Sequence, residues 1–227
     1  MLKSVLFDID GTITDTNPIF LDAIVQTHYE MTGQQKNREF FHFSLGIPSP
    51  VTLGILDIPQ EFRMLYIQRW QEHIKEKMHK VVLFPRIVTV LESLREWGLS
   101  MALVTSKVRS EFSFQFDSFG LNHFFQAIIC ADDASRPKPN PDPLFEACSR
   151  LGVKPREAIY VGDSRYDIMA AKAAGIPFLF ASWGSIDPNS VLELHPEFYL
   201  KEPIEILDVV QKKTQVEIPT QLNYQNM

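Results

Sequence analysis

Short runs of apolar residues alternate along the chain with segments of helical periodicity. Each run is four or five residues long and gives way to a polar, charged or glycine-containing turn, which is typical of buried strands. We expect strands at residues 4–7, 100–104, 127–130, 158–161 and 177–180. Strands that alternate with helices predict an α/β fold with a doubly wound parallel sheet.

Helices are expected between these strands. Apolar residues recur at helical spacing from Val88 to Trp97, and Gly98 is a suitable stop. A second helix is expected from about Pro143 to Gly152, and a third, rich in alanine, follows Asp163 and ends at Gly175.

Residues 17–82 interrupt the alternation, because they show helical periodicity and no convincing strand. One face carries Phe20, Ala23, Ile24 and Thr27, and a later one carries Ile67, Trp70, Ile74 and Met78. We interpret 46–50 as the loop between them and 17–82 as an inserted helical cap domain. The α/β core would then comprise 1–16 and 83–211, with Asp15-Thr16 and Phe84-Pro85 as hinge connections.

Composition narrows the functional classes. The chain has 227 residues and a formal net charge of −6, which argues against a broad nucleic-acid surface. No apolar stretch approaches the length of a membrane span, and the two cysteines show no ligand spacing, so we expect reduced thiols and a cytoplasmic protein. The polar residues 212–227 are expected to form a flexible tail.

The first strand ends in two acids, Asp8 and Asp10, followed by Gly11. Two ionised carboxylates about 4 Å apart repel by roughly 4 kcal/mol at an effective dielectric near 20. A divalent cation with oxygen ligands would hold them together. Gly11 permits a tight turn whose N–H groups face an anion.

Polar residues also follow the other strands. Sites in doubly wound sheets lie beyond the carboxyl ends of the strands, so these residues should meet. They are Thr105, Ser106 and Lys107 after the second strand, Lys138 after the third, and Asp163 and Asp167 after the fourth. Three or four acids in one site require a metal ion, and Asp163 and Asp167 share one helix face.

Four segments resemble the haloacid dehalogenase superfamily of aspartate-nucleophile phosphatases, in its phosphoglycolate phosphatase-like branch. They are FDIDGTITDT from Phe7, ALVTSK from Ala102, RPKPNPDP from Arg136 and YVGDSRYDIMAAKAAGIP from Tyr160. The resemblance spans roughly Leu2 to Val209. It implies a parallel-sheet core with a helical cap inserted after the first motif, as expected for 17–82.

The resemblance also assigns roles. It implies that Asp8 attacks phosphorus and that Asp10 protonates the leaving oxygen and then activates water. Mg²⁺ would be held by Asp8, Asp163 and the backbone carbonyl of Asp10, with Asp167 nearby or as a further ligand. The phosphate would be bound by Gly11, Thr12, Thr105, Ser106 and Lys138. Lys107 and Arg109 are weaker candidates, because each could instead be a solvated residue at a helix start.

Two departures from the family pattern concern loops: Pro137 stands where glycine commonly precedes Lys-Pro, and Arg86 follows Pro85 where glycine is common. The leading prediction is a Mg²⁺-dependent phosphatase acting on a small phosphorylated metabolite such as phosphoglycolate, a sugar phosphate or pyrophosphate. The alternatives are a phosphomutase and a non-catalytic binding protein. The cap, where Phe43 and Ser44 are candidate contacts, would select the substrate, and the oligomeric state stays open.

Overall fold

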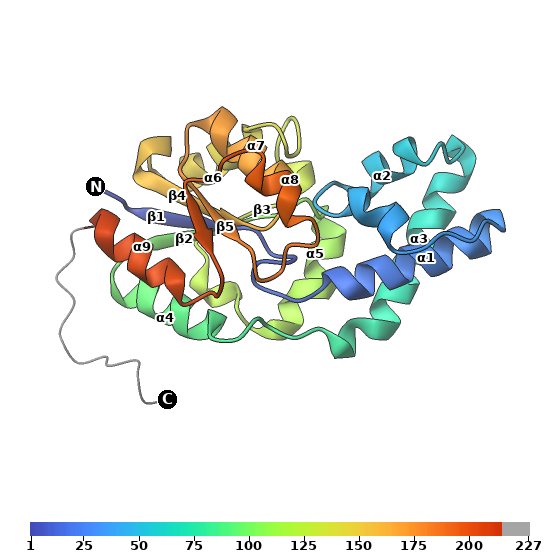
Figure 1. Cartoon of the computed structure of the whole chain (residues 1–227), viewed down its shortest axis with the longest axis horizontal. Helices are drawn as coiled ribbons and strands as arrows, with labels where there is room; N and C mark the ends of the chain where they lie inside the picture. The colour runs from blue at the N-terminus through green and yellow to red at the C-terminus, as the bar shows by residue number, and fades with distance from the viewer. Residues whose placement is uncertain (215–227) are drawn as a thin grey trace.

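Six parallel strands form the centre of the protein in a computed structural model that describes residues 1–214 (Figure 1). In sheet order they are β3 (Ala127–Ile129), β2 (Ser100–Val104), β1 (Ser4–Phe7), β4 (Ala158–Gly162), β5 (Phe178–Ala181) and β6 (Phe198–Leu200). β1 is central because all four of its residues are buried and it pairs with β2 on one side and β4 on the other.

Helices cover both faces of the sheet. On one face lie α4 (Ile87–Glu96), α5 (Arg109–Phe116) and α9 (Glu205–Thr214), which share a core with Val5 and Phe7 of β1. On the other lie α6 (Asp142–Leu151), α7 (Arg165–Ala174) and α8 (Pro188–Leu192), packed against Leu6 and Tyr160. The predicted doubly wound α/β fold is thus confirmed.

The direction of winding reverses between β1 and β4. The chain runs outward from β1 to β2 and β3 and then returns to β4 on the opposite side of β1. Single 3-10 turns occur in these connections: η3 (Asp117–Phe119), η4 (Asn122–Phe124), η5 (Ala131–Asp133) and η6 (Pro155–Glu157). Between β1 and β4, where the winding reverses, the loops at the carboxyl ends of the two strands diverge. Ligands bind at such a point in open α/β sheets.

A helical unit lies beside the carboxyl edge of the sheet (Figure 1). It contains α1 (Asn17–Thr32), η1 (Glu39–Ser44), α2 (Ser49–Ile55), α3 (Gln60–Lys77) and η2 (Met78–Lys80). Its buried apolar side chains form a cluster of their own, which includes Ile24, Phe41 and Trp70. The separate cluster supports the division into core and cap at 17–82, which stays a prediction.

Two chain segments connect this helical unit to the sheet, and they pair with each other. Thr14 forms a bridge with Leu83, the Asp15 N–H donates to the Val82 carbonyl at 2.9 Å, and the Phe84 N–H donates to the Ile13 carbonyl at 3.0 Å. The two segments that were predicted to act as hinges therefore pair as one short two-stranded ribbon.

Three elements differ from the sequence expectations. β6 was not predicted, because it is a three-residue edge strand in which only Leu200 is fully buried. The expected loop at 46–50 ends early, since Ser49 starts α2 and Pro50 occupies its first turn, where proline is favoured. α9 continues through Lys212 and Lys213 to Thr214, which is buried, so the tail cannot begin at 212.

The remaining expected tail, residues 215–227, lies outside the described residues. Within residues 1–214 no helix is both long and apolar enough to cross a membrane. Both cysteines are buried and free, as expected.

Candidate active site

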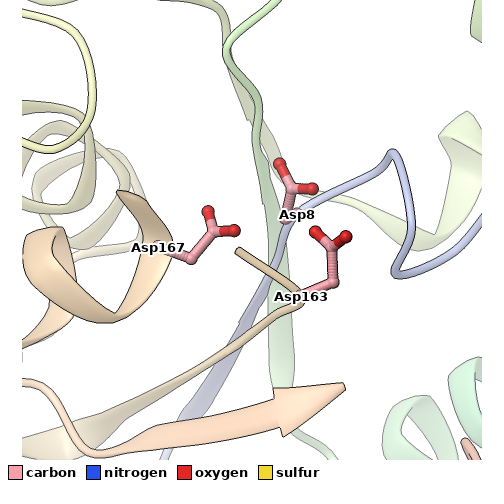
Figure 2. A group of neighbouring side chains, drawn as sticks. All are labelled: Asp8, Asp163 and Asp167. Carbon is pink, nitrogen blue, oxygen red and sulfur yellow. The ribbon is translucent and has the colours of Figure 1, made fainter. Parts of the chain in front are cut away.

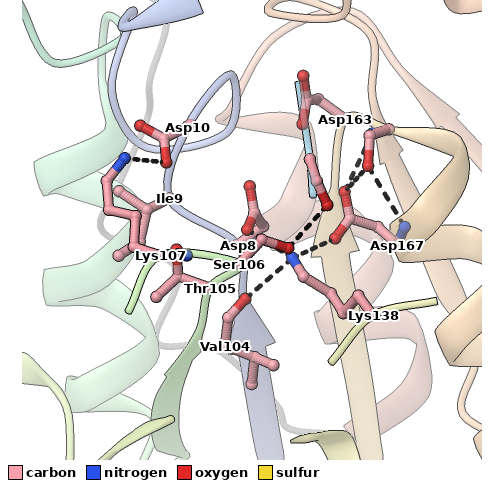
Figure 3. Close-up of polar contacts among 12 residues, drawn as sticks. Asp8, Ile9, Asp10, Val104, Thr105, Ser106, Lys107, Lys138, Asp163 and Asp167 are labelled. Atoms are coloured by element: carbon pink, nitrogen blue, oxygen red, sulfur yellow. Dashed lines mark hydrogen bonds and ion pairs between the residues drawn. The ribbon is translucent and has the colours of Figure 1, made fainter. Parts of the chain in front are cut away.

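Lys138 lies at the centre of a buried polar network that joins the ends of β1 and β2 to β4 and α7 (Figure 3). Its Nζ is 2.7 Å from Asp8 Oδ1 and 2.6 Å from Asp167 Oδ1. It also donates to the Tyr160 hydroxyl at 3.0 Å and the Val104 carbonyl at 3.2 Å. Burial alone would lower the pKa of Lys138, but Asp167 and Asp8 outweigh burial and raise it, so the ammonium stays charged.

Asp167 has little capacity left for a further ligand. Oδ1 accepts from Lys138 and, at 2.7 Å, from Tyr160, while Oδ2 accepts from the Ser164 hydroxyl at 2.5 Å and the Ser164 N–H at 3.1 Å. Ser164 is also the N-cap of α7, so the start of the helix fixes Asp167 directly. Two oxygens that accept four hydrogen bonds are saturated.

Three buried carboxylates converge beside this lysine (Figure 2). One oxygen each from Asp8, Asp163 and Asp167 lies within 4.8 Å of the others. Burial raises the pKa of Asp8 to about 7; Lys138 opposes this rise, and Asp167 and Asp10 add to it. Burial, followed by the charges of Asp167 and Asp8, raises the pKa of Asp163 well above its usual range.

The donor set fits a hard divalent cation. Asp163 takes part in no ion pair within residues 1–214; its Oδ2 accepts only a long, 3.3 Å hydrogen bond from Asn17. The single charge of Lys138 cannot balance three nearby carboxylates, and oxygen-only donors are the ligands that Mg²⁺ prefers. The residues present therefore suit the expected Mg²⁺, for which Asp8 and Asp163 are the best placed ligands.

The loop after β1 reaches this cluster only because Gly11 has no side chain. Its φ is +76°, in the left-handed region, and a Cβ there would lie 2.1 Å from Asp163 Oδ2. Gly184, in the loop after β5, approaches the same loop, since a Cβ on it would lie 2.0 Å from the Gly11 carbonyl oxygen. Any side chain at either position would displace the turn that positions Asp10.

Asp10 is held apart from the three-carboxylate cluster. Its Oδ1 accepts from the Thr16 hydroxyl at 2.5 Å, and its Oδ2 is ion-paired with Lys107. Lys107 also lies over the Phe20 ring, 4.1 Å from its centroid. Of the two interpretations left open for Lys107, the solvated one is excluded, because this side chain is only 7% exposed.

The predicted phosphate contacts lie at the same edge. Thr105 is buried, and its Oγ1 accepts from the Lys107 N–H at 3.2 Å. The Thr12 hydroxyl is buried and has no hydrogen-bond partner within the described part of the chain. Ser106 Oγ donates to the Gly46 carbonyl at 2.7 Å and thereby contacts the loop before α2.

A cavity opens from these groups toward the helical unit. Asp8, Asp10 and Asp163 line its base, together with Ser106 and Lys107. Across from them the helical unit contributes Phe20, Ser44, Leu45, Ile47, Ser49, Trp70, Gln71 and Ile74. Ser44, a candidate substrate contact, thus lines this cavity, whereas Phe43 lines a neighbouring pocket beside Tyr166.

Sequence reasoning missed several residues of the site. Tyr160 lies inside an expected strand, and no role in the site was predicted for Tyr160, Asn17 or Ser164. Asn17 reaches Asp163 from a position 146 residues away, and Lys107 reaches Asp10 from 97 residues away. No local signal in the sequence indicates such pairs.

The fold and the site together define a haloacid dehalogenase-like hydrolase. The model of that family matches residues 5–181, and the chain belongs to this family of enzymes.

Relatives that span almost the whole chain agree with this assignment. Pyrophosphatase PpaX from Oceanobacillus iheyensis is 30% identical over 210 residues, which cover 92% of this chain and 97% of the relative. Pyrophosphatase PpaX from Bacillus pumilus is also 30% identical, over 211 residues, with 92% and 96% covered.

Solved structures show the same fold. A Lactobacillus plantarum protein provisionally named a phosphoglycolate phosphatase superposes with a TM-score of 0.82 at 25% identity, covering 92% of this chain and 99% of the other. A hydrolase from Pseudomonas syringae has a TM-score of 0.83 at 21% identity, covering 92% and 98%. The fold, the enzyme class and the family predicted from the sequence are therefore confirmed.

Proposed function

We propose that this protein is a Mg²⁺-dependent phosphatase that hydrolyses a small organic phosphate through an aspartyl-phosphate on Asp8. The observation that carries the proposal is the pairing of Asp8 with Lys138 at 2.7 Å inside a buried cluster of acids. A lysine in this position aims the nucleophile and favours its ionised form, since it opposes the rise in the pKa of Asp8 that burial causes, and it would neutralise the phosphoryl oxygens during transfer.

In the first step an oxygen of Asp8 bonds to phosphorus and the bond from phosphorus to the leaving oxygen breaks. Asp10, oriented by Thr16 and Lys107, gives a proton to that leaving oxygen. In the second step water attacks phosphorus, its proton passes to Asp10, and the bond to Asp8 breaks. Asp8 is regenerated and inorganic phosphate is released.

The remaining residues bind and orient. Bound Mg²⁺, held by Asp8, Asp163 and the Asp10 carbonyl, would supply positive charge to the phosphoryl oxygens. The other phosphate oxygens would accept hydrogen bonds from the N–H groups after Gly11 and from the hydroxyls of Thr12, Thr105 and Ser106. Asp167, whose oxygens are saturated, would position Lys138 rather than bind the metal.

The test is hydrolysis of a panel of phosphate esters by the purified full chain with Mg²⁺ or with chelator. Asp8→Asn should reduce kcat by about 10⁴-fold or more, since the nucleophile is lost. Asp22→Asn is the matched control, because Asp22 pairs only with Arg38 on the surface of the helical unit. Intact hydrolysis by Asp8→Asn, or equal activity in chelator, would overturn the mechanism.

Product analysis separates this proposal from its alternatives. Release of inorganic phosphate without an isomerised sugar excludes a phosphomutase. A folded wild-type protein that hydrolyses nothing in the panel would favour a non-catalytic binding protein. The relatives named pyrophosphatases support transfer to water rather than back to a sugar.

A further inference from the structure

The cavity has a polar wall that the proposed chemistry does not use. We define the polar wall as Ser49 of α2, Gln71 of α3, and Glu111 and Gln115 of α5. It presents one carboxylate, two amides and one hydroxyl. Among the described residues that line the cavity, Lys107 is the only lysine, arginine or histidine, and it is already paired with Asp10.

Glu111 places a negative charge on this wall. The residue is 8% exposed, and its Oε1 accepts from the Ser49 hydroxyl at 2.8 Å and from the Gln71 amide at 3.2 Å. Its Oε2 accepts from the Val108 N–H at 3.2 Å. Within residues 1–214 it takes part in no ion pair, so the carboxylate is held by neutral donors alone.

Gln115 lies one helical turn beyond Glu111 and on the same face of α5. It is 4% exposed, and its Oε1 has no hydrogen-bond partner in the described part of the chain. A buried amide oxygen without a partner costs free energy unless a ligand donates to it. A hydroxyl group suits this amide, because it can donate to the oxygen and accept from the nitrogen.

The charges of the wall argue against an anionic leaving group. A carboxylate or second phosphate would normally be recognised by arginine or lysine, and no unpaired cation lines the described cavity. Instead it would approach the carboxylate of Glu111, which is largely buried, and like charges repel more strongly beside a buried group than in water. An unpaired or repelled charge is a common means of rejecting a competing ligand.

We propose that this enzyme selects phosphate esters whose leaving group is uncharged and rich in hydroxyls, and that Glu111 rejects leaving groups with a second negative charge. Gln115 and Gln71 receive the hydroxyls, while Phe20, Trp70 and Ile74 supply the apolar part of the pocket. The proposal rests on the proposed phosphatase function and names its substrate class. It places phosphoglycolate and pyrophosphate among the poor substrates.

The experiment compares kcat/KM for two kinds of substrate with the purified full chain and Mg²⁺. Glycerol 3-phosphate and glucose 6-phosphate have uncharged hydroxylated leaving groups, whereas phosphoglycolate and pyrophosphate have anionic ones. We expect the hydroxylated pair to be preferred by about tenfold or more. Preference for either anionic substrate would overturn the inference while leaving the phosphatase intact.

Substitution of the wall tests the cause of the preference. Glu111→Gln keeps the shape and removes the charge, so the ratio of kcat/KM between glycerol 3-phosphate and phosphoglycolate should fall by about tenfold. Ser49→Ala is the matched control, since it removes a hydrogen bond to Glu111 but leaves the charge. Ser49→Ala should change kcat/KM for both substrates by the same factor.

Two further outcomes decide the role of the wall. If Glu111→Gln changes kcat/KM for both substrates by the same factor, Glu111 only links the helical unit to the core through its hydrogen bonds, and the inference is wrong. Gln115→Leu should raise KM for glycerol 3-phosphate more than for p-nitrophenyl phosphate, which lacks the aliphatic hydroxyls. If wild type hydrolyses neither these esters nor p-nitrophenyl phosphate, the proposed function itself fails and the inference falls with it.

Discussion

The acid cluster at the carboxyl edge of the sheet and the polar wall across the cavity both bury charge, but they differ in how that charge is balanced. At the sheet edge, Lys138 contacts Asp8, Asp167, Tyr160 and a backbone carbonyl at once. On the wall, Glu111 has only neutral donors among residues 1–214, and Gln115 Oε1 has no donor there. Geometry is thus fixed in advance at the proposed reaction site, whereas the wall keeps the hydrogen-bonding capacity that the proposed substrate would use.

The largest effect is expected from removing the balancing cation at the sheet edge. Lys138→Met leaves Asp8 and Asp167 buried without their partner, which should lower the free energy of unfolding by about 3–5 kcal/mol and abolish turnover. Urea unfolding measures this loss. Lys172→Met, on the exposed side of α7, should change stability by no more than about 0.5 kcal/mol. A stable Lys138→Met protein would show that the network does not depend on this charge.

A second prediction concerns pH and metal. The folded-state pKa of Asp8 is raised to about 7 and that of Asp163 is also raised, so the folded protein binds protons more tightly than the unfolded chain. The sign follows from linkage: without metal, stability should fall as pH rises from about 4 to 7. Mg²⁺ should restore it, and more at pH 8 than at pH 5. Thermal unfolding with Mg²⁺ or chelator measures this, and a Mg²⁺ effect that does not grow with pH would contradict it.

A smaller effect is expected at the hydrogen bond that joins the sheet edge to the helical unit, between the two regions. Ser106 Oγ donates to the Gly46 carbonyl and so links the end of β2 to the loop before α2. Ser106→Ala should raise KM by roughly threefold to tenfold, the effect of one hydrogen bond. Steady-state kinetics measure it, and Ser113→Ala, which removes only an exposed bond within α5, should leave KM unchanged. Equal effects of the two variants would argue against the link.

The smallest effect is expected at the junction of α4, outside both regions. Arg86 is exposed and has a φ of +66°, a conformation that glycine adopts without strain. Arg86→Gly should therefore raise the free energy of unfolding by up to about 1 kcal/mol. Glu92→Gly, in the helical interior of α4, should lower it by about 1 kcal/mol. Urea unfolding of both variants should show opposite signs, and equal signs would exclude strain at Arg86.

Sequence could predict the parts of the site that lie in short motifs. Asp8 and Asp163 directly follow buried strands and Asp167 lies in the first turn of the next helix, so an α/β topology alone places them at one edge. It could not predict that Lys107 pairs with Asp10, because that contact depends on how the loop after β1 and the loop before α5 meet in space, beside Phe20 of α1. Glu111 was missed for a different reason: a glutamate three residues after Val108 also closes the first turn of α5, and helix starts commonly contain one.

One departure from the family pattern, Arg86 in place of glycine, has a structural effect that the sequence does not show. Arg86 keeps the left-handed backbone for which glycine is the natural choice, so a sequence difference there became a local strain rather than a new loop. β6 and α2 were missed because a three-residue edge strand and a seven-residue helix are too short to show a clear periodicity.

The ribbon between the helical unit and the sheet has a consequence for how a substrate is discriminated. Thr14 bridges Leu83 of the returning segment and also bridges Asp10 itself. A rotation of the helical unit about this ribbon would carry with it the backbone of Asp10, the proposed proton donor. A molecule that fits the cavity poorly would leave the helical unit, and with it Asp10, in an unfavourable position. Its poor fit would then lower kcat as well as affinity.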